Sequence, residues 1–399
     1  MPQADRPIYL DHHATTPVDR RVLDAMLPYF GEKFGNASSV NHAYGWEAAD
    51  AVEAARDKIA RLIRADPRSL IFTSGATEAN NLVLKGVVQA APPQSHVITT
   101  SAEHRSVLDP LRRLARTGTD VTFLNVDSHA RVSPDDVAKA IRANTVLVSV
   151  IFANNEVGSL NPIREISELC RERGVLFHTD AVQAVGKLSL DLSDLCIDLL
   201  SASAHKLYGP KGVGVLFCRR SGPRISIEPL LHGGGHEQRL RSGTLPVPLI
   251  VGFGEACRIA SEAMPAEAAR LAGLRERLWV GLCRELDGLV LNGHPSERLA
   301  GNLNVSFEGV DGDALMTGLS GIAVSSGSAC TSADPEPSHV LRAMGRSDGL
   351  TRASLRFGLG RSTTAPQIEQ AIAIVAATVR RLRTTRTAST RPASQLEKE

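Results

Sequence analysis

Short apolar runs alternate with stretches of helical periodicity through residues 70–206, and this alternation limits the fold more than any other feature of the chain. Residues 70–73, 96–100 and 175–180 are runs with the length of single strands. Strands that alternate with helices form a mostly parallel sheet with helices on its faces. We therefore predict an α/β fold whose ligands bind in the loops that follow the carboxyl ends of the strands.

The composition is that of a globular protein with a sizeable core. The chain has 399 residues, of which 43% are hydrophobic, and a formal net charge of +2. This balance provides no broad basic field for nucleic acid, and no apolar stretch approaches the roughly 18 residues of a membrane span. Residues 1–6 show no signal-peptide pattern, so we expect a cytoplasmic protein without direct nucleic-acid or membrane partners.

The sheet pattern ends around residues 246–248, where a long helical region begins. Shorter strands and helices follow it and suggest a smaller α+β domain. We predict a large domain over residues 15–260 and a small domain over residues 1–14 and 261–383. Residues 384–399 are polar and without periodicity, so we expect a disordered tail.

The segment at residues 198–210 delivers a lysine to the end of a predicted strand. An apolar run leads into small residues and then into Ser203, His205 and Lys206, and a Gly-Pro turn follows. An amine held at such a strand end can have a lowered pKa and can form a Schiff base with a carbonyl group. Most lysines after strands are solvated surface charges, so Lys206 by itself is a weak signal.

Asp180 strengthens this signal, because it ends the preceding apolar strand. A buried carboxylate needs a cationic partner, and a protonated pyridine nitrogen would supply one. Enzymes that use pyridoxal phosphate hold it through a lysine and pair its ring nitrogen with an acidic residue. Lys206 and Asp180 thus fit the two ends of this cofactor, whereas the simpler alternative for Asp180 is a helix N-cap.

The turn at residues 74–78, Ser-Gly-Ala-Thr-Glu, opens a helix directly after a predicted strand. Backbone amides and a hydroxyl group at a helix N-terminus form an anion site, so the turn with Ala76 and Thr77 could hold a phosphate group. No Gly-Lys-Ser/Thr follows, which excludes a Walker loop. The alternative is an ordinary capped helix.

Histidines and an asparagine also follow predicted strands. His104 ends a polar turn, where it can stack on a planar ring and transfer protons near neutral pH, and a surface loop histidine is the competing interpretation. Asn155 follows the predicted strand at residues 146–153. His232 and His236 are separated by three glycines, which cannot hold two imidazoles on one helical face, so no metal site is predicted.

The six cysteines include no Cys-x-x-Cys pair, so neither a zinc site nor a disulfide framework is indicated. Five of them lie in apolar patterns typical of buried thiols. Cys330 instead lies among small residues, from Ser325 to Ser332. A segment of this composition packs poorly and should move, which would let a thiolate travel between two sites.

Taken together, the chain resembles a cysteine desulfurase of the housekeeping iron-sulfur cluster assembly type, in the class V aminotransferase group of fold-type I pyridoxal phosphate enzymes. Matching stretches run from Leu10 to Arg361. They include residues 73–78 (TSGATE), 154–158 (NNEVG), 178–183 (HTDAVQ), 203–206 (SAHK), 241–244 (RSGT) and 325–330 (SSGSAC). The resemblance implies a large cofactor-binding domain with a mostly parallel seven-stranded sheet, and a small domain that carries the mobile cysteine loop.

The resemblance also implies a role for each candidate in the cofactor site. Lys206 would bind pyridoxal phosphate covalently, Asp180 would pair with the ring nitrogen, and His104 would stack on the ring. Gln183 and Asn155 would lie near the ring oxygen. The phosphate would be bound at the turn of Ala76, by Thr77, Ser203 and His205.

Two further residues follow from the resemblance. Thr244 would reach the phosphate bound by the partner subunit, which implies a homodimer. Arg356 would bind the carboxylate of the substrate L-cysteine, a task suited to a guanidinium group, and Asn155 would lie near the same substrate.

In the implied reaction, L-cysteine displaces Lys206 from the cofactor, and the freed amine removes the Cα proton. The thiolate of Cys330 attacks the substrate sulfur, alanine leaves, and Cys330 carries a persulfide. His104 is the candidate for handling the thiol protons. The sulfur would pass to an iron-sulfur scaffold or another acceptor protein, for clusters or for thiolated cofactors and tRNA.

Three alternatives remain open from the sequence. A class V aminotransferase or a selenocysteine lyase would keep Lys206 and Asp180, although an aminotransferase would not need Cys330. A protein that serves only as a docking platform would need none of Lys206, Asp180, His104 and Cys330, so the complete set argues against it.

Overall fold

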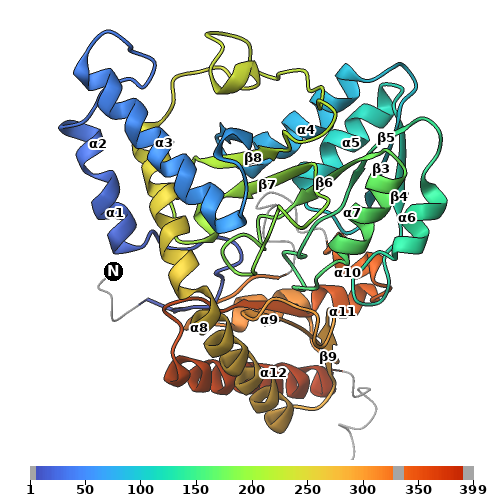
Figure 1. The fold of residues 1–399 in the computed structure, drawn as a ribbon. Helices are drawn as coiled ribbons and strands as arrows, with labels where there is room; N and C mark the ends of the chain where they lie inside the picture. The colour runs from blue at the N-terminus through green and yellow to red at the C-terminus, as the bar shows by residue number, and fades with distance from the viewer. Residues whose placement is uncertain (1–5, 327–336, 390–399) are drawn as a thin grey trace, which may run out of the picture.

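The computed structural model describes residues 6–326 and 337–389, and its centre is a seven-stranded sheet (Figure 1). The strands are β2 (Leu70–Thr73), β3 (His96–Thr100), β4 (Asp120–Leu124), β5 (Thr145–Ser149), β6 (Leu176–Asp180), β7 (Leu199–Ser203) and β8 (Gly214–Cys218). They lie in the order β2-β8-β7-β6-β5-β3-β4. Strand β8 runs antiparallel to both of its neighbours, and the other neighbouring strands are parallel. The prediction of a mostly parallel seven-stranded sheet is confirmed.

Helices cover both faces of this sheet because successive strand residues point to opposite sides. Leu70 and Phe72 of β2 pack into one apolar cluster, and Ile71 packs into another. The first cluster includes residues of α1 (Arg20–Met26), α3 (Ala43–Ile63), α6 (Pro134–Ala140), α7 (Ile163–Glu172) and α8 (Val247–Glu285). The second includes residues of α4 (Ala76–Ala90) and α5 (Arg105–Arg116), and the short α2 (Pro28–Gly31) follows α1.

A smaller antiparallel sheet has its own apolar core. Its strands are β9 (Leu289–Asn292), β10 (Asn302–Phe307) and β12 (Ser354–Gly358), with β10 in the middle. The helices nearby are α9 (Gly312–Gly318), α10 (His339–Ala343), α11 (Asp348–Arg352) and α12 (Ala365–Ser389), and β1 (Ile8–Tyr9) pairs with β11 (Ile322–Ala323). The domain boundary at residue 260 stays a prediction, which the separate core supports.

Helix α8 belongs to both parts of the molecule, as Figure 1 shows where it descends from the large sheet toward α12. Its first half buries Ile250 and Phe253 in the core of the large sheet. Its second half buries Leu278 and Leu282 in the core of the small sheet. One continuous helix therefore ties the two cores together.

The closing helix is longer than the sequence predicted. We expected disorder from residue 384, but α12 continues to Ser389, so that boundary was wrong. The hydroxyl groups of Thr384 and Thr385 donate to the carbonyl groups one turn earlier, at 3.0 and 2.8 Å, which accommodates these polar residues in the helix. Residues 390–399 and 327–336, the latter with Cys330, lie outside the described residues. Among the described helices, none is long and apolar enough to cross a membrane.

Candidate active site

The carboxyl ends of several strands of the large sheet open on one pocket of about 480 Å³, which we call the strand-end pocket. Most of the predicted site residues line it, namely Ala76, Thr77, His104, Asn155, Asp180, Gln183, Ser203, His205, Lys206 and Arg356. Thr244 does not line this pocket and is exposed, and Cys330 lies outside the described residues. The fold therefore brings together residues that are up to 280 positions apart, from Ala76 to Arg356.

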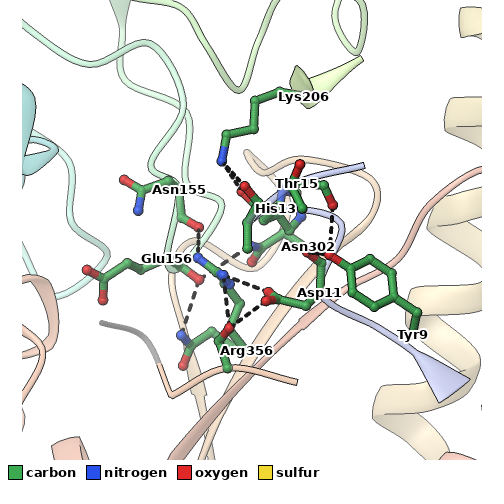
Figure 2. Close-up of polar contacts among 12 residues, drawn as sticks. Tyr9, Asp11, His13, Thr15, Asn155, Glu156, Lys206, Asn302 and Arg356 are labelled. Atoms are coloured by element: carbon green, nitrogen blue, oxygen red, sulfur yellow. Dashed lines mark hydrogen bonds and ion pairs between the residues drawn. The ribbon is translucent and has the colours of Figure 1, made fainter. Parts of the chain in front are cut away.

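Lys206 lies in a 3-10 turn, Ala204–Lys206, directly after β7. Its Nζ donates hydrogen bonds to the backbone oxygens of His13 and Ala14, at 2.7 and 2.5 Å (Figure 2). Thr16 ties the same segment to the turn, because its Oγ1 donates to the backbone oxygen of His205 at 2.9 Å. The N-terminal segment thus holds the lysine amine, a contact that the sequence analysis did not predict.

Asp180 ends β6, and 4% of the residue is exposed. Its Oδ2 accepts a hydrogen bond from Nδ2 of Asn80 at 2.8 Å, and its Oδ1 accepts one from the backbone N–H of Val182 at 3.1 Å. Within residues 6–326 and 337–389, no cationic side chain forms an ion pair with this carboxylate. A buried carboxylate held by neutral donors can still accept a cationic group from a ligand.

A hydrogen-bonded chain connects Asp180 to His104. The Nδ2 of Asn80, on α4, also donates to Oγ of Ser106 at 2.8 Å, and this hydroxyl lies 2.8 Å from Nδ1 of His104. The backbone N–H of Ser106 donates to the same Nδ1 at 3.1 Å. Because Nδ1 accepts both bonds, the neutral ring carries its proton on Nε2. The sequence analysis did not predict a role for Asn80. Its place on the sheet-facing side of a helix could have indicated one, because a fully buried amide needs a hydrogen-bond partner.

The N-terminus of α4 faces the strand-end pocket through Ala76 and Thr77. Gly75 precedes the helix with a φ of 149°, a conformation that residues with a side chain rarely adopt. Because glycine has no side chain, the first amides of the helix receive no side-chain cap from this position. Ser203 and His205 line the same pocket. Helix amides and hydroxyl groups that converge in this way provide an anion site.

The electrostatic field at this end of the pocket is positive. Burial, followed by the charges of Lys206 and Lys211, lowers the pKa of His205 to about 4, so the ring is neutral. Its Nδ1 lies 3.1 Å from Oγ1 of Thr15. A bound anion would offset the repulsion among these groups.

Arg356, on β12, brings a buried guanidinium group from the small sheet into the pocket, and 2% of the residue is exposed. Its Nη2 pairs with Oδ1 of Asp11 at 2.7 Å, and its Nη1 donates to the backbone oxygen of Asn155 at 3.0 Å (Figure 2). In the described part of the chain, its Nε has no hydrogen-bond partner. The guanidinium group is therefore held in place with donor capacity left for a carboxylate.

Both described ends of the segment that contains Cys330 are attached near Arg356. On one side, Oγ of Ser325 donates to Oδ2 of Asp11, the partner of Arg356, at 2.8 Å. On the other side, Oγ of Ser338 donates to a carboxylate oxygen of Glu156, next to Asn155. Ser325 therefore contacts Arg356, which lines the strand-end pocket, and Ser338 is held by the neighbour of Asn155, which lines it too.

Comparisons with known proteins agree with this architecture. The family model for class-V aminotransferases matches residues 8–371. The cysteine desulfurase IscS of Anaeromyxobacter sp. (strain Fw109-5) is 54% identical over 378 residues, which are 94% of this chain and 93% of that protein. The mitochondrial cysteine desulfurase of Arthroderma benhamiae is 51% identical over 94% of this chain and 75% of its own length.

Solved structures lead to the same family. A NifS-like protein has a TM-score of 0.88 at 36% identity, and the match covers 94% of this chain and 100% of that chain. The structure titled SspA in complex with cysteine has a TM-score of 0.79 at 38% identity, covering 88% of this chain and 98% of that chain. The predicted family is confirmed, and the chain belongs to the class V aminotransferases, within them to the cysteine desulfurases.

Proposed function

We propose that this cysteine desulfurase uses pyridoxal phosphate held by Lys206 and places the sulfur of L-cysteine on Cys330. The observation that carries the proposal is that Lys206, Asp180 and the N-terminus of α4 line one pocket. They suit the aldehyde, the ring nitrogen and the phosphate of the cofactor, respectively. The buried Asp180 carboxylate, which lacks a cationic partner among the described residues, supports the fit.

When bound, pyridoxal phosphate supplies an electron sink for the substrate carbanion. Asp180 would hold the ring nitrogen in its protonated form, and Asn80 holds the carboxylate in place. The amine of Lys206 would take the proton from the substrate Cα. His104 would face the ring and handle the thiol protons, while Ser106 holds its Nδ1.

Arg356 binds the carboxylate of L-cysteine in this proposal. Its Nε lacks a partner among the described residues, and Nη1 carries a second hydrogen beside the one it donates to Asn155, whereas Nη2 donates to both Asp11 and Ser325. Asp11 fixes the guanidinium plane by an ion pair of 2.7 Å. The arginine is thus preorganised, which lowers the entropic cost of binding the substrate.

The sulfur step balances within the enzyme and its substrate. The thiolate of Cys330 attacks the substrate sulfur, an S–S bond forms, and the bond between sulfur and Cβ breaks. The electron pair of that bond remains with the carbon part, which is released as alanine after protonation, and Cys330 becomes a persulfide. The attachment of Ser325 and Ser338 beside Arg356 supports a reach from Cys330 to this site.

The active unit in this proposal is a homodimer. Six apolar residues on and around α2 and α3 are more than half exposed, namely Leu27, Phe30, Phe34, Val40, Tyr44 and Trp46. Exposed apolar groups that gather in this way mark protein interfaces. Thr244, exposed and outside the strand-end pocket of its own chain, would then reach the pocket of the partner. Sedimentation should find twice the mass of one chain.

The cellular role completes the proposal. The protein acts in the cytoplasm and passes its persulfide sulfur to an iron-sulfur scaffold or another acceptor protein. The names of relatives such as the IscS of Anaeromyxobacter sp. support this assignment. Transfer of labelled sulfur from the loaded enzyme to purified candidate acceptors tests it.

A single-turnover experiment with sulfur-labelled L-cysteine tests the catalytic proposal. The purified protein is loaded with pyridoxal phosphate, the visible absorbance is checked, and alanine and protein-bound label are followed. We expect label on the wild type and no label on Cys330→Ala. The matched control is Cys283→Ala, which removes an exposed thiol on α8 and should retain the label.

The outcomes separate the proposal from its alternatives. Alanine formation with label that depends on Cys330 supports the desulfurase. Visible absorbance without alanine or label would redirect the search to aminotransferase reactions. Activity with selenocysteine alone would indicate a selenocysteine lyase, and absence of both absorbance and turnover would leave only a docking role.

A further inference from the structure

Behind Lys206 lies a second cavity of about 50 Å³, which we call the rear cavity. It is lined by the N-terminal segment with His12 and His13, by Lys187 after β6, and by Glu267 of α8, among others. His13 and Lys206 line both the rear cavity and the strand-end pocket. These two residues therefore form part of the wall between the two spaces.

The rear cavity contains buried polar atoms without partners. His12 is 3% exposed, and neither of its ring nitrogens has a hydrogen-bond partner among the described residues. The Oε1 of Glu267 also lacks one, whereas its Oε2 pairs with Arg361 at 3.2 Å. Buried polar atoms are nearly always hydrogen-bonded, if not to protein then to ordered water. A cavity of this size has room for a few water molecules, each of which needs roughly 15 Å³.

Lys187 connects this cavity to the strand-end pocket. Its Nζ donates a hydrogen bond of 2.6 Å to Oε1 of Gln183, and no carboxylate among the described residues lies close enough for an ion pair. Burial, followed by the charges of Lys206 and Arg356, lowers the pKa of Lys187 to about 7, and the charge of Glu267 opposes this shift. Because Lys187 donates this bond, the oxygen of the Gln183 amide faces Lys187 and its NH2 group points away.

The fixed amide in turn orders the groups around Lys206. The Nε2 of Gln183 donates to the backbone oxygen of His13 at 2.9 Å, and the same oxygen accepts from Nζ of Lys206 at 2.7 Å. The Nδ1 of His13 lies 3.0 Å from Oε1 of Gln183, and its Nε2 lies 3.3 Å from the backbone oxygen of Gly301. A continuous chain of contacts therefore runs from Lys187 through Gln183 and His13 to Lys206.

We propose that Lys187 is a positioning residue of the active site. Water in the rear cavity holds Lys187 against Gln183, and Gln183 in turn keeps its own amide and the carbonyl group of His13 oriented toward Lys206. Three polar side chains that line the rear cavity, His12, Lys187 and Glu267, would be the partners of this water, and a buried water molecule usually has about three. The inference rests on the proposed function, since Gln183 is expected beside the cofactor.

The test uses the full chain loaded with pyridoxal phosphate, and its main readout is the pH midpoint of the visible absorption band. Lys187→Met keeps the length of the side chain but removes the donor and the charge. We expect the midpoint to rise by at least about 0.5 pH unit, because a nearby cation disfavours protonation of the Lys206 nitrogen. We also expect kcat to fall about tenfold with KM for L-cysteine changed less than about twofold.

Two further variants keep the test decisive. Lys85→Met removes a partly buried lysine of α4 that lines neither space, and it should titrate like the wild type. His12→Phe leaves Lys187 in place but removes one partner of the water, so its midpoint should shift in the same direction by less. Should Lys187→Met fail to fold, His12→Phe still carries the comparison with Lys85→Met.

The outcomes distinguish this inference from the proposed function. A wild type that gains no visible band with pyridoxal phosphate would overturn both. A normal band, with Lys187→Met and His12→Phe titrating like Lys85→Met, would overturn the positioning role alone. A crystal structure of the loaded enzyme should show an ordered water molecule within hydrogen-bonding distance of His12 and Glu267, and a dry cavity would contradict the proposed water.

Discussion

The strand-end pocket and the rear cavity meet at Lys206 and His13, yet they are built for different contents. The strand-end pocket measures about 480 Å³, and its polar groups come mainly from loops that follow strands. The rear cavity measures about 50 Å³, and polar groups from the N-terminal segment and α8 point into it without partners. The first can admit a cofactor with its substrate, whereas the second can admit only water.

Lys206 borders both spaces, and each space affects a different property of this lysine. On the side of the strand-end pocket, Lys206 faces the groups that would bind and use a ligand. On the other side, one of its hydrogen-bond acceptors, the carbonyl group of His13, is contacted by Gln183, which in turn accepts a hydrogen bond from Lys187. The residues of the strand-end pocket would therefore carry out the reaction, and the residues of the rear cavity would orient Lys206.

The largest effect should come from the lysine in the wall itself. Lys206→Ala removes the amine that would bind the cofactor and move the Cα proton, so kcat should fall by at least about 10³-fold, and the visible band of the bound cofactor should change. Steady-state alanine production and absorbance spectra provide the measurements. The control is Lys85→Ala, and near-normal turnover of Lys206→Ala would refute the assignment of the strand-end pocket.

The next effect should appear at the opposite rim of the strand-end pocket. Arg356→Lys keeps a positive charge but loses the planar donor pair, so KM for L-cysteine should rise about 10–100-fold, the value of a lost charged hydrogen bond. Alanine production over a range of L-cysteine concentrations measures this change. Arg346→Lys, on the small domain and outside both spaces, is the control. A change in kcat with KM unaltered would argue against binding of the substrate carboxylate by Arg356.

A smaller effect should follow from loosening the inner support of the strand-end pocket. Asn80→Ala leaves Asp180 with one fewer donor and Ser106 without its amide partner, so kcat should fall about tenfold. Asn81→Ala, at a half-buried position of α4, is the matched control, because among the described residues the side chain of Asn81 hydrogen-bonds to the backbone oxygen of Thr77 and not to Asp180 or Ser106. Equal kcat values for the two variants would show that the hydrogen bonds from Asp180 to His104 do not contribute to catalysis.

The smallest expected effect is a change in stability at low pH, measured for one histidine of each space. Burial lowers the pKa values of His12 and His205 to about 4, so between pH 6.5 and 4 the unfolded chain binds protons that the folded chain does not. Stability therefore falls as pH decreases through this window. In the apoprotein, His12→Phe and His205→Gln should each reduce the acid-induced loss of Tm by about 1–3 °C.

Loading with cofactor should separate these two histidines. A phosphate beside His205 favours the charged ring, so the benefit of His205→Gln should vanish in the loaded enzyme, whereas that of His12→Phe should remain. Calorimetry at pH 6.5 and 5, with and without cofactor, measures both. A benefit of His205→Gln that persists in the loaded enzyme would place the phosphate elsewhere.

Much of the strand-end pocket could be predicted from the sequence. Asp180 ends an apolar strand, His104 and Lys206 follow apolar strands within a few residues, and the carboxyl ends of parallel strands meet at one edge of a sheet. Thr77 begins a helix after a strand, where amides collect an anion. Local pattern and one rule of topology were sufficient for these positions.

The sequence by itself determined the alternation of strands and helices and the residues that end each strand, because periodicity and chain direction are local properties. Only the tertiary structure decided that the segment of His12 and His13 lies against Lys206, and that Lys187 and Glu267 line the same small cavity. These contacts join residues more than 70 positions apart, and no spacing in the chain encodes them. They arise because folding buries polar atoms together, and each buried atom must then find a partner or water.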